Sequence, residues 1–359
     1  MSGTSCDGLD VALIEVRNDG HEVRWLALKE FAYSDRWAAR LRGLGTLPER
    51  EVRTLEQEWT NWVLDHMGPQ LNAWTKEFGP LHLVGFSGHT WYHEPAGRGT
   101  CAIGDAVRLQ AAWGMPVVAD YRSADVAAGG QGAPLVPLFD ALLFKEHAAC
   151  LNLGGVANVT VQKPDGVIRA SDLCGCNLLL NRQALRLGIP LDRDGRGAAE
   201  GNCSSEALAQ LDGWSHLTRP WPKSLAAEDL GALHAVLDAC VRPEDALATG
   251  VHWVAKTVAE ALEAQSVTGS VMATGGGAHH PVLVRQLREE LARHNMVLNI
   301  PDLRWVDGKE AAAFAWLAWR TAMGRTTSLA TVTGAATDVC GGVLYGNFTP
   351  PGMNGPTSG

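Results

Sequence analysis

The sequence lacks the features that would place it in a membrane, on a secretory route or on nucleic acid. No run of about 18 apolar residues occurs, so we expect no membrane-spanning helix. The first residues lack a basic stretch followed by an apolar stretch, so we expect no signal peptide. The 30 Lys and Arg residues are outnumbered by 39 Asp and Glu, which gives a formal net charge of −9. Binding to a phosphate backbone needs clustered positive charge, so we do not expect a nucleic-acid partner.

Cysteine is present, but without the spacing of a metal site. Of the eight cysteines only Cys174 and Cys176 lie close together, and a single Cys-x-Cys lacks the second pair that a structural zinc site needs. Reduced thiols are therefore expected, which is typical of a cytoplasmic protein. A hydrophobic content of 46% with 19% charged residues describes a globular chain, not a disordered one.

The length predicts two domains, because 359 residues exceed one ordinary core. The Gly- and Pro-rich stretch Gly129–Pro134 is the predicted crossing between them. We expect residues 1–130 with 324–359 to form domain I, and residues 131–323 to form domain II.

The chain opens on a polar loop with two glycines, Met1–Asp10. Two predicted strands follow it, Val11–Val16 and Val23–Phe31, joined by the turn Asn18-Asp19-Gly20. Small residues let backbone N–H groups approach phosphate oxygens, hydroxyls add donors, and a carboxylate can hold Mg²⁺. The loop therefore predicts phosphate binding, with a frayed polar chain end as the alternative.

A second glycine-containing turn followed by predicted strands lies in the middle of the chain. The strand Ala149–Leu153 leads to the turn Gly154-Gly155, and the strand Val156–Gln162 follows it. The two copies predict two similar α/β domains facing each other across a cleft. They differ in one respect: a strand precedes the glycine turn in the second copy, and no strand precedes the loop in the first.

A third glycine turn, Thr274–Gly277, follows the predicted strand Gly269–Ala273 and precedes a helix that begins near Pro281. Glycine turns are common, and any one of them is weak evidence. Three of them beside strands predict three points of contact with one nucleotide.

Together these segments resemble the anhydro-N-acetylmuramic acid kinase family, which has the fold of actin, sugar kinases and the Hsp70 ATPase. The resemblance covers nearly the whole chain in the family's order, and its most specific part is Val118–Pro137. The segments that carry it are Met1–Asp10, Gly88–His93 with Pro95, Val117–Pro137, Leu151–Thr160, Ala273–Pro281, Glu310–Arg320 and Val332–Ala335.

The resemblance implies an α/β fold with two similar RNase H-like domains around a nucleotide cleft, each with a mixed five-stranded sheet flanked by helices. It implies an ATP- and Mg²⁺-dependent kinase, cytoplasmic and homodimeric, acting on 1,6-anhydro-N-acetylmuramic acid. Water would open the anhydro ring while O6 receives the γ-phosphoryl group. The product would be N-acetylmuramic acid 6-phosphate, an intermediate of cell-wall (peptidoglycan) recycling.

The resemblance also implies roles for residues. Asp172 matches the catalytic aspartate, a general base for the attacking water, and such a base supplies on the order of 10²–10⁴-fold in rate. Asp7 and Asp10 would lie near Mg²⁺. The implied sugar contacts are Thr90, Arg122, Glu310 and Asn177. The implied nucleotide contacts are Gly3, Thr4, Ser5, Cys6, Asp7, Gly8, Leu9, Asp10, Gly154, Gly155, Gly275, Gly276 and Gly277.

Several of these residues have a structural alternative. Asp172 precedes a predicted helix at Asn177, so its alternative role is to cap that helix. Arg122 and Asp125 would alternatively form a surface ion pair, which contributes little to stability. Glu310 would alternatively begin an Ala-rich helix and complement its dipole.

Two motifs depart from the family pattern. Asp172 is followed by Leu-Cys-Gly-Cys-Asn where the family usually has Thr-Gly-Pro-Gly-Asn, so Cys174 or Cys176 stands in place of a glycine. Residues 86–90 read Phe-Ser-Gly-His-Thr where the family usually has Ser-His-Gly-Gln-Thr, which displaces one sugar-facing histidine. These departures leave open a kinase for another anhydrosugar, such as levoglucosan, or a non-catalytic nucleotide- or sugar-binding protein.

The third departure is the strand that should lead into the opening loop. We expect either a start that omits about eight residues, or a sheet with a gap beside its phosphate loop.

Overall fold

The computed structural model describes residues 1–3 and 6–350. They form two compact units: unit 1 contains Met1–Phe139 and the chain from Glu310 onward, and unit 2 contains Asp140–Lys309. Within the described residues no helix is long and apolar enough to cross a membrane.

The chain passes between the units at Phe139 and at Glu310, whereas residues 130 and 323 were expected. The boundary expected at residue 323 lies instead at Glu310, because α12 (Leu303–Ala322) is one continuous helix that belongs to both units. Trp316 in its second half is fully buried in unit 1 and donates a hydrogen bond from Nε1 to Gly20 O at 2.9 Å. The return to unit 1 therefore takes place inside the helix.

Unit 2 contains one mixed five-stranded sheet in the order β11-β10-β7-β8-β9. Strand β10 runs parallel to both of its neighbours, while β8 is antiparallel to β7 and to β9. The strands are β7 (Ala149–Leu153), β8 (Val156–Gln162), β9 (Ile168–Gly175), β10 (Gly269–Thr274) and β11 (Met296–Asn299). This sheet confirms the predicted mixed five-stranded sheet of the second domain.

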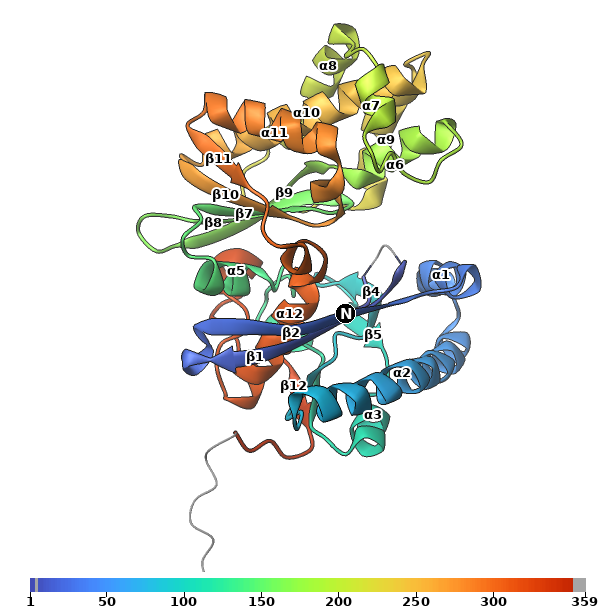
Figure 1. Ribbon diagram of the computed structural model, residues 1–359, viewed down its shortest axis with the longest axis vertical. Helices are drawn as coiled ribbons and strands as arrows, with labels where there is room; N and C mark the ends of the chain where they lie inside the picture. The colour runs from blue at the N-terminus through green and yellow to red at the C-terminus, as the bar shows by residue number, and fades with distance from the viewer. Residues whose placement is uncertain (4–5, 351–359) are drawn as a thin grey trace, which may run out of the picture. The chain divides into compact units, whose positions relative to one another are not determined.

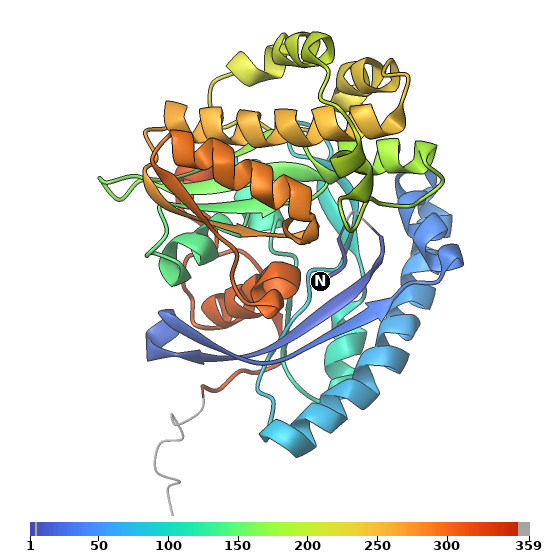
Figure 2. The same ribbon diagram turned by 45° about the horizontal axis from the view of Figure 1, so that its top comes forward.

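Helices α10 (Pro243–Ala264) and α11 (Pro281–Arg293) lie side by side over one face of this sheet (Figures 1 and 2). Both begin with proline, which suits the first turn of a helix because its missing N–H would have no partner there. The remaining helices of this unit are α6 (Asn177–Arg186), α7 (Arg196–Glu200), α8 (Ser205–Asp212) and α9 (Gly231–Asp238). Helix α5 (Pro137–Leu143) carries the chain from unit 1 into unit 2.

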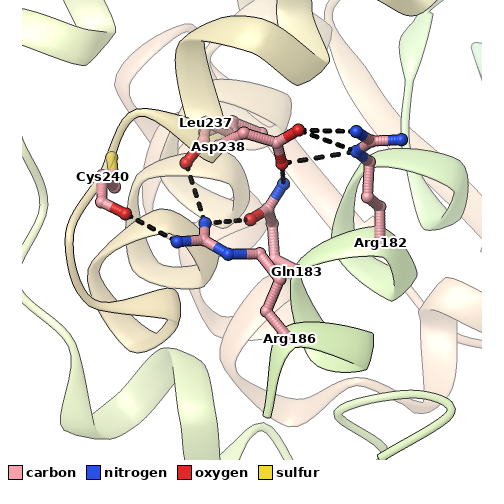
Figure 3. Close-up of polar contacts among 6 residues, drawn as sticks. All are labelled: Arg182, Gln183, Arg186, Leu237, Asp238 and Cys240. Atoms are coloured by element: carbon pink, nitrogen blue, oxygen red, sulfur yellow. Dashed lines mark hydrogen bonds and ion pairs between the residues drawn. The ribbon is translucent and has the colours of Figure 1, made fainter. Parts of the chain in front are cut away.

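A polar network holds α6 against the end of α9 (Figure 3). The guanidinium of Arg182 forms a bidentate ion pair with the carboxylate of Asp238, with Nη2 2.6 Å from Oδ2. Gln183 donates a hydrogen bond to the other oxygen of this carboxylate at 2.9 Å. Arg186 donates to the carbonyl oxygens of Leu237 and Cys240 at 3.2 and 2.8 Å. The network fixes the helix whose first residue is Asn177.

The described residues of unit 1 form three smaller sheets in place of one. The hairpin of β1 (Gly8–Arg17) and β2 (Glu22–Ala32) is antiparallel, as its turn signal predicted. A three-stranded sheet has the order β12-β6-β3, and β4 pairs with β5. These strands are β3 (Val84–Gly85), β4 (His89–Glu94), β5 (Gly99–Ile103), β6 (Val117–Ala119) and β12 (Val343–Tyr345). Within the described residues β1 is not hydrogen-bonded to β3, so the five-stranded sheet expected here is interrupted.

Helix α2 (Glu49–Phe78) supplies much of the core of unit 1. Its buried apolar side chains recur at helical spacing, which is why the segment folds as an amphipathic helix. They are Val52, Leu55, Trp59, Val63, Met67, Leu71 and Trp74. The other helices are α1 (Asp35–Arg42), α3 (Ala106–Trp113), α4 (Ser123–Ala127) and α13 (Ala330–Thr333).

Candidate active site

In unit 2 two of the predicted glycine turns lie together at the ends of β7 and β10. A Cβ atom on Gly275 would clash with Asn152, and one on Gly277 would lie 2.8 Å from Leu153 Cβ. Gly275 also has a φ of 85°, a conformation that favours glycine. Glycine is therefore required for the third turn to pack against the residues that lead into Gly154.

Asn177 joins these two turns. Its backbone N–H donates to Gly154 O at 3.1 Å, and its Nδ2 donates to Leu153 O at 2.9 Å. Cβ atoms on Gly276 and Gly277 would lie 3.4 and 3.1 Å from the side-chain amide of Asn177. The structure thus brings together the second and third predicted glycine turns, Gly154-Gly155 and Gly275–Gly277, and Asn177, which was predicted to contact the sugar, contacts both.

Asp172 lies inside β9 and is half-buried. Its Oδ2 accepts a hydrogen bond from Leu225 N–H at 2.8 Å, and its own N–H donates to Lys223 O at 2.9 Å. Burial raises the pKa of this carboxyl group, and the Leu225 N–H opposes the shift. A raised pKa is what a carboxylate needs to accept a proton from water near neutral pH.

The capping alternative for Asp172 is wrong. Helix α6 begins after Cys176, and no side chain caps its first turn. Asp172 lies too early in the chain for that role because β9 continues to Gly175.

The two cysteines that depart from the family pattern face the interior of unit 2. Cys174 and Cys176 are fully buried in its hydrophobic core. Burial raises the pKa of both thiols, that of Cys176 to about 12, so they remain neutral. Gly175 between them is still required, because a Cβ there would lie 2.9 Å from Leu179 and 3.0 Å from Leu230.

In unit 1, Ser2 and Cys6 of the opening segment make contacts within the described residues. Ser2 Oγ lies 2.9 Å from Tyr33 Oη and 2.9 Å from His89 Nδ1. Cys6 N–H donates to Gly3 O at 3.2 Å, and the Cys6 side chain is buried. Thr4 and Ser5 lie outside the described residues.

The loop is shorter than the sequence predicted, because Gly8, Leu9 and Asp10 belong to β1. Leu9 is buried in the core of unit 1. A Cβ on Gly8 would lie 2.9 Å from Phe31 O, so this glycine is needed for pairing with β2. Gly8 and Leu9 therefore have packing roles in the structure.

Asp7 and Asp10 are the carboxylates predicted to lie near Mg²⁺. Asp7 is exposed and Asp10 half-buried, and burial is the main cause that raises the pKa of Asp10 to about 6. The described residues contain no group of three or more His, Cys, Asp or Glu side chains that could hold a metal ion. Mg²⁺ fits this donor set when nucleotide phosphates and water supply the other ligands, because it usually takes only one or two protein carboxylates.

Three of the four predicted sugar contacts, Thr90, Arg122 and Glu310, belong to unit 1, whereas Asn177 belongs to unit 2. Thr90 on β4 and Arg122 line one small cavity with Ser87, Gly88 and Asp120. Arg122 Nη1 donates to Gly132 O at 2.7 Å. Burial lowers the pKa of Arg122, and the carboxylate of Glu310 opposes that shift. Glu310 lies seven residues inside α12, which begins at Leu303, so the helix-start alternative is wrong.

Sequence reasoning missed the role of Asp125. Its side chain is fully buried and accepts hydrogen bonds from Gly132 N–H at 2.7 Å, Ser328 Oγ at 2.7 Å and Thr333 Oγ1 at 2.8 Å. The predicted surface ion pair with Arg122 is therefore wrong. Asp125 instead fixes the Gly-rich stretch whose Gly132 carbonyl positions Arg122.

The shifted histidine motif also has a structural explanation. His89 is buried, with Nδ1 against Ser2 and Nε2 3.9 Å from Cys6 Sγ, and it does not line the cavity at Thr90. The displaced histidine therefore supports the opening loop in place of facing sugar.

Comparison with known proteins identifies the class of this chain. The model of the family described as anhydro-N-acetylmuramic acid kinase matches residues 1–347. Proteins with that name from Paramagnetospirillum magneticum, Thiobacillus denitrificans and Pseudomonas syringae pv. tomato are 38%, 35% and 34% identical. The matches cover 95%, 98% and 96% of this chain and 97%, 96% and 97% of those relatives. The chain is an ATP-dependent carbohydrate kinase. It belongs to the anhydro-N-acetylmuramic acid kinase family.

Among solved structures, a ROK-family glucokinase from Streptomyces griseus is 15% identical, with a TM-score of 0.39 over 89% of this chain and 97% of that one.

Proposed function

We propose that this chain opens the 1,6-anhydro ring of 1,6-anhydro-N-acetylmuramic acid and phosphorylates O6. The observation that carries the proposal is Asp172. It is a half-buried carboxylate with a raised pKa, one oxygen held by Leu225 N–H, and it lies in β9 ahead of the helix that begins at Asn177. Within the described residues its Oδ1 accepts no hydrogen bond from the chain, which leaves that atom for a water molecule.

In the proposed step, Asp172 accepts a proton from water while the water oxygen bonds to the anomeric carbon. The bond between that carbon and O6 breaks, and O6 takes the γ-phosphoryl group as ADP leaves. Mg²⁺–ATP, when bound, supplies the phosphoryl group and neutralises part of its charge.

We propose separate tasks for the two sets of residues. In unit 2 the backbone of Gly154, Gly155 and Gly275–Gly277 contacts the nucleotide, because glycine has no side chain to keep phosphate oxygens away from backbone N–H groups. In unit 1, Gly3 with Asp7 and Asp10 contacts the phosphates and Mg²⁺, while Thr90, Arg122 and Glu310 bind the sugar. The proposed cytoplasmic location is supported by eight free cysteines and by the need for ATP. The homodimer stays a prediction.

The test is an assay of the purified chain for ADP release with ATP and Mg²⁺, using 1,6-anhydro-N-acetylmuramic acid and levoglucosan in parallel. ADP release that depends on the muramic acid sugar supports the proposal. Release that depends only on levoglucosan would establish the alternative substrate. If neither sugar stimulates release by the folded protein, a non-catalytic binding protein is the better description.

A further inference from the structure

A loop from later in the chain pairs with the outer edge of the unit 2 sheet at Asp172. Strand β9 is the last strand of this sheet, and β8 lies on its inner side. The N–H of Asp172 donates to Lys223 O at 2.9 Å, and Leu225 N–H donates back to Asp172 Oδ2 at 2.8 Å. The segment Lys223–Leu225 therefore holds both the backbone and the carboxylate of the proposed base.

Ser171, which precedes the proposed base, contacts the same segment. Its Oγ accepts a hydrogen bond from Lys223 N–H at 3.2 Å and lies 3.3 Å from Lys223 O. The Ser171 side chain is buried, so these contacts are made away from water, where hydrogen bonds are stronger. The backbone of Lys223 thus contacts two successive residues of β9, and a displacement of Lys223 also moves the N–H group that holds Asp172.

The side chain of Lys223 holds this loop closed. Its Nζ donates to the carbonyl oxygens of His216 and Leu217 at 2.7 and 3.2 Å. Both residues belong to the 3-10 turn Ser215–Thr218, in which His216 is buried and Leu217 packs against the hydrophobic core of unit 2. The ammonium group therefore ties the segment beside Asp172 to a fixed part of the unit.

This contact is made without a counter-charge. Among the described residues Lys223 forms no ion pair, and the hydrogen bonds of its Nζ go to carbonyl oxygens. Burial is the main cause that lowers the pKa of this half-buried ammonium group. Removing a cation from water without a partner of opposite charge costs free energy, and residues that carry such a cost are expected at functional sites.

We propose that Lys223 is a positioning residue for Asp172. Its ammonium group ties residues 216 and 217 to residue 223, which keeps Leu225 N–H on Asp172 Oδ2 and leaves Oδ1 for the attacking water. Lys223 acts only through the loop. Without the Leu225 contact the carboxylate would lose both its fixed orientation and a hydrogen bond that favours its charged form. The part played in the reaction rests on the proposed function, whereas the effect of Lys223 on the carboxyl group of Asp172 does not.

The test compares the parent chain with Lys223→Met, which keeps the length of the side chain and removes its donors. Carbon-13 NMR follows the titration of the Asp172 carboxyl group, and hydrogen exchange follows the Leu225 amide. In the variant the pKa of Asp172 should rise above its parent value, because burial still raises it while the opposing Leu225 N–H is lost. The Leu225 amide should exchange about 10-fold faster or more.

Two matched controls separate this effect from loss of charge and from general loosening. Arg219→Met removes an exposed positive charge from the same loop, where Arg219, Lys223 and Asp229 are the charged side chains that act on His216. Lys163→Met removes a half-buried lysine whose Nζ likewise donates to a backbone carbonyl, Gln265 O, in the turn between β8 and β9. Neither control should change the Asp172 titration or the exchange of the Leu225 amide.

Steady-state kinetics then tests the part played in the reaction. In Lys223→Met the kcat of sugar-dependent ADP release should fall about 10-fold or more, with little change in the KM for ATP. Lys223→Arg keeps the charge and the donors and should recover most of the rate. If Lys223→Met does not fold, Lys223→Gln is measured in the same way with the same expected directions.

Each other result counts against a stated part of the account. An Asp172 pKa and a Leu225 exchange rate equal to those of the parent would overturn the positioning role, whatever the activity. Equal changes in either control would overturn it as well. A shifted pKa with unchanged kcat would contradict a part in the reaction. A shifted pKa in a protein whose parent form releases no sugar-dependent ADP would support the positioning of Asp172 and contradict the proposed function.

Discussion

Lys309 and Asp140, the last and first residues of unit 2, form a buried ion pair with Nζ 2.9 Å from Oδ1. Both side chains are 4% exposed, and Thr160 Oγ1 donates to the other carboxylate oxygen at 3.0 Å. The pair ties together the two points at which the chain enters and leaves the unit.

We expect Lys309→Ala to lower the free energy of unfolding by about 3–5 kcal/mol, because it leaves Asp140 buried without a counter-charge. Urea unfolding followed by circular dichroism measures the change. The matched control is Lys256→Ala, which removes a partly exposed ion pair with Asp212 and should cost about 1 kcal/mol or less. Equal losses for the two variants would contradict a special role for the buried pair.

We expect Asp172→Asn to reduce sugar-dependent ADP release by about 10²–10⁴-fold, because the amide cannot accept the proton from water. The amide oxygen can still accept the hydrogen bond from Leu225, so the melting temperature should change little. Asp165→Asn, in the exposed turn between β8 and β9, is the control and should keep full activity. Unchanged turnover in the Asp172 variant would remove this residue from the mechanism.

We expect Arg122→Lys to raise the KM for the sugar by roughly 10–100-fold with little effect on the KM for ATP. A hydrogen bond to a charged group is worth about 1.5–3 kcal/mol, and lysine cannot contact both Gly132 O and a ligand as the guanidinium can. Steady-state kinetics with each substrate varied in turn gives the two constants. The control is Arg98→Lys, at an exposed arginine that stacks on Tyr92, and it should leave both KM values unchanged. Equal rises in both KM values would point to a general loss of structure.

Protein stability should fall as the pH drops from about 6.5 to about 4, in part because of His89. Burial lowers the pKa of His89 from 6.5 to about 4, so the unfolded chain takes up this proton before the folded one does. The contribution is fully present above pH 6.5 and amounts to roughly 3 kcal/mol at most. Unfolding free energies of His89→Gln at several pH values should show a shallower slope than those of the parent chain. The exposed His21→Gln should leave the slope unchanged, and an equal slope in the His89 variant would contradict the assignment.

Much of the fold was predictable because it depends on local patterns. The turn Asn18–Gly20 and the glycine turns after β7 and β10 depend on neighbouring residues. The site was harder to interpret, since Asp125 and His89 are polar residues whose partners lie far away in sequence. Neither the burial of Asp125 beneath Ser328 and Thr333 nor the contact of His89 with Ser2 follows from local spacing. The continuity of α12 through Lys309 and Glu310 likewise moved the domain division, because an unbroken helical pattern gives no boundary signal.

The most direct test of the account is the mass of the product formed by the purified chain from 1,6-anhydro-N-acetylmuramic acid, ATP and Mg²⁺. The account predicts a product equal to the anhydrosugar plus one water and one phosphoryl group, with the phosphate on O6 and one ADP released per product. Folded protein that releases no sugar-dependent ADP, or a phosphorylated product that has not gained water, would contradict it.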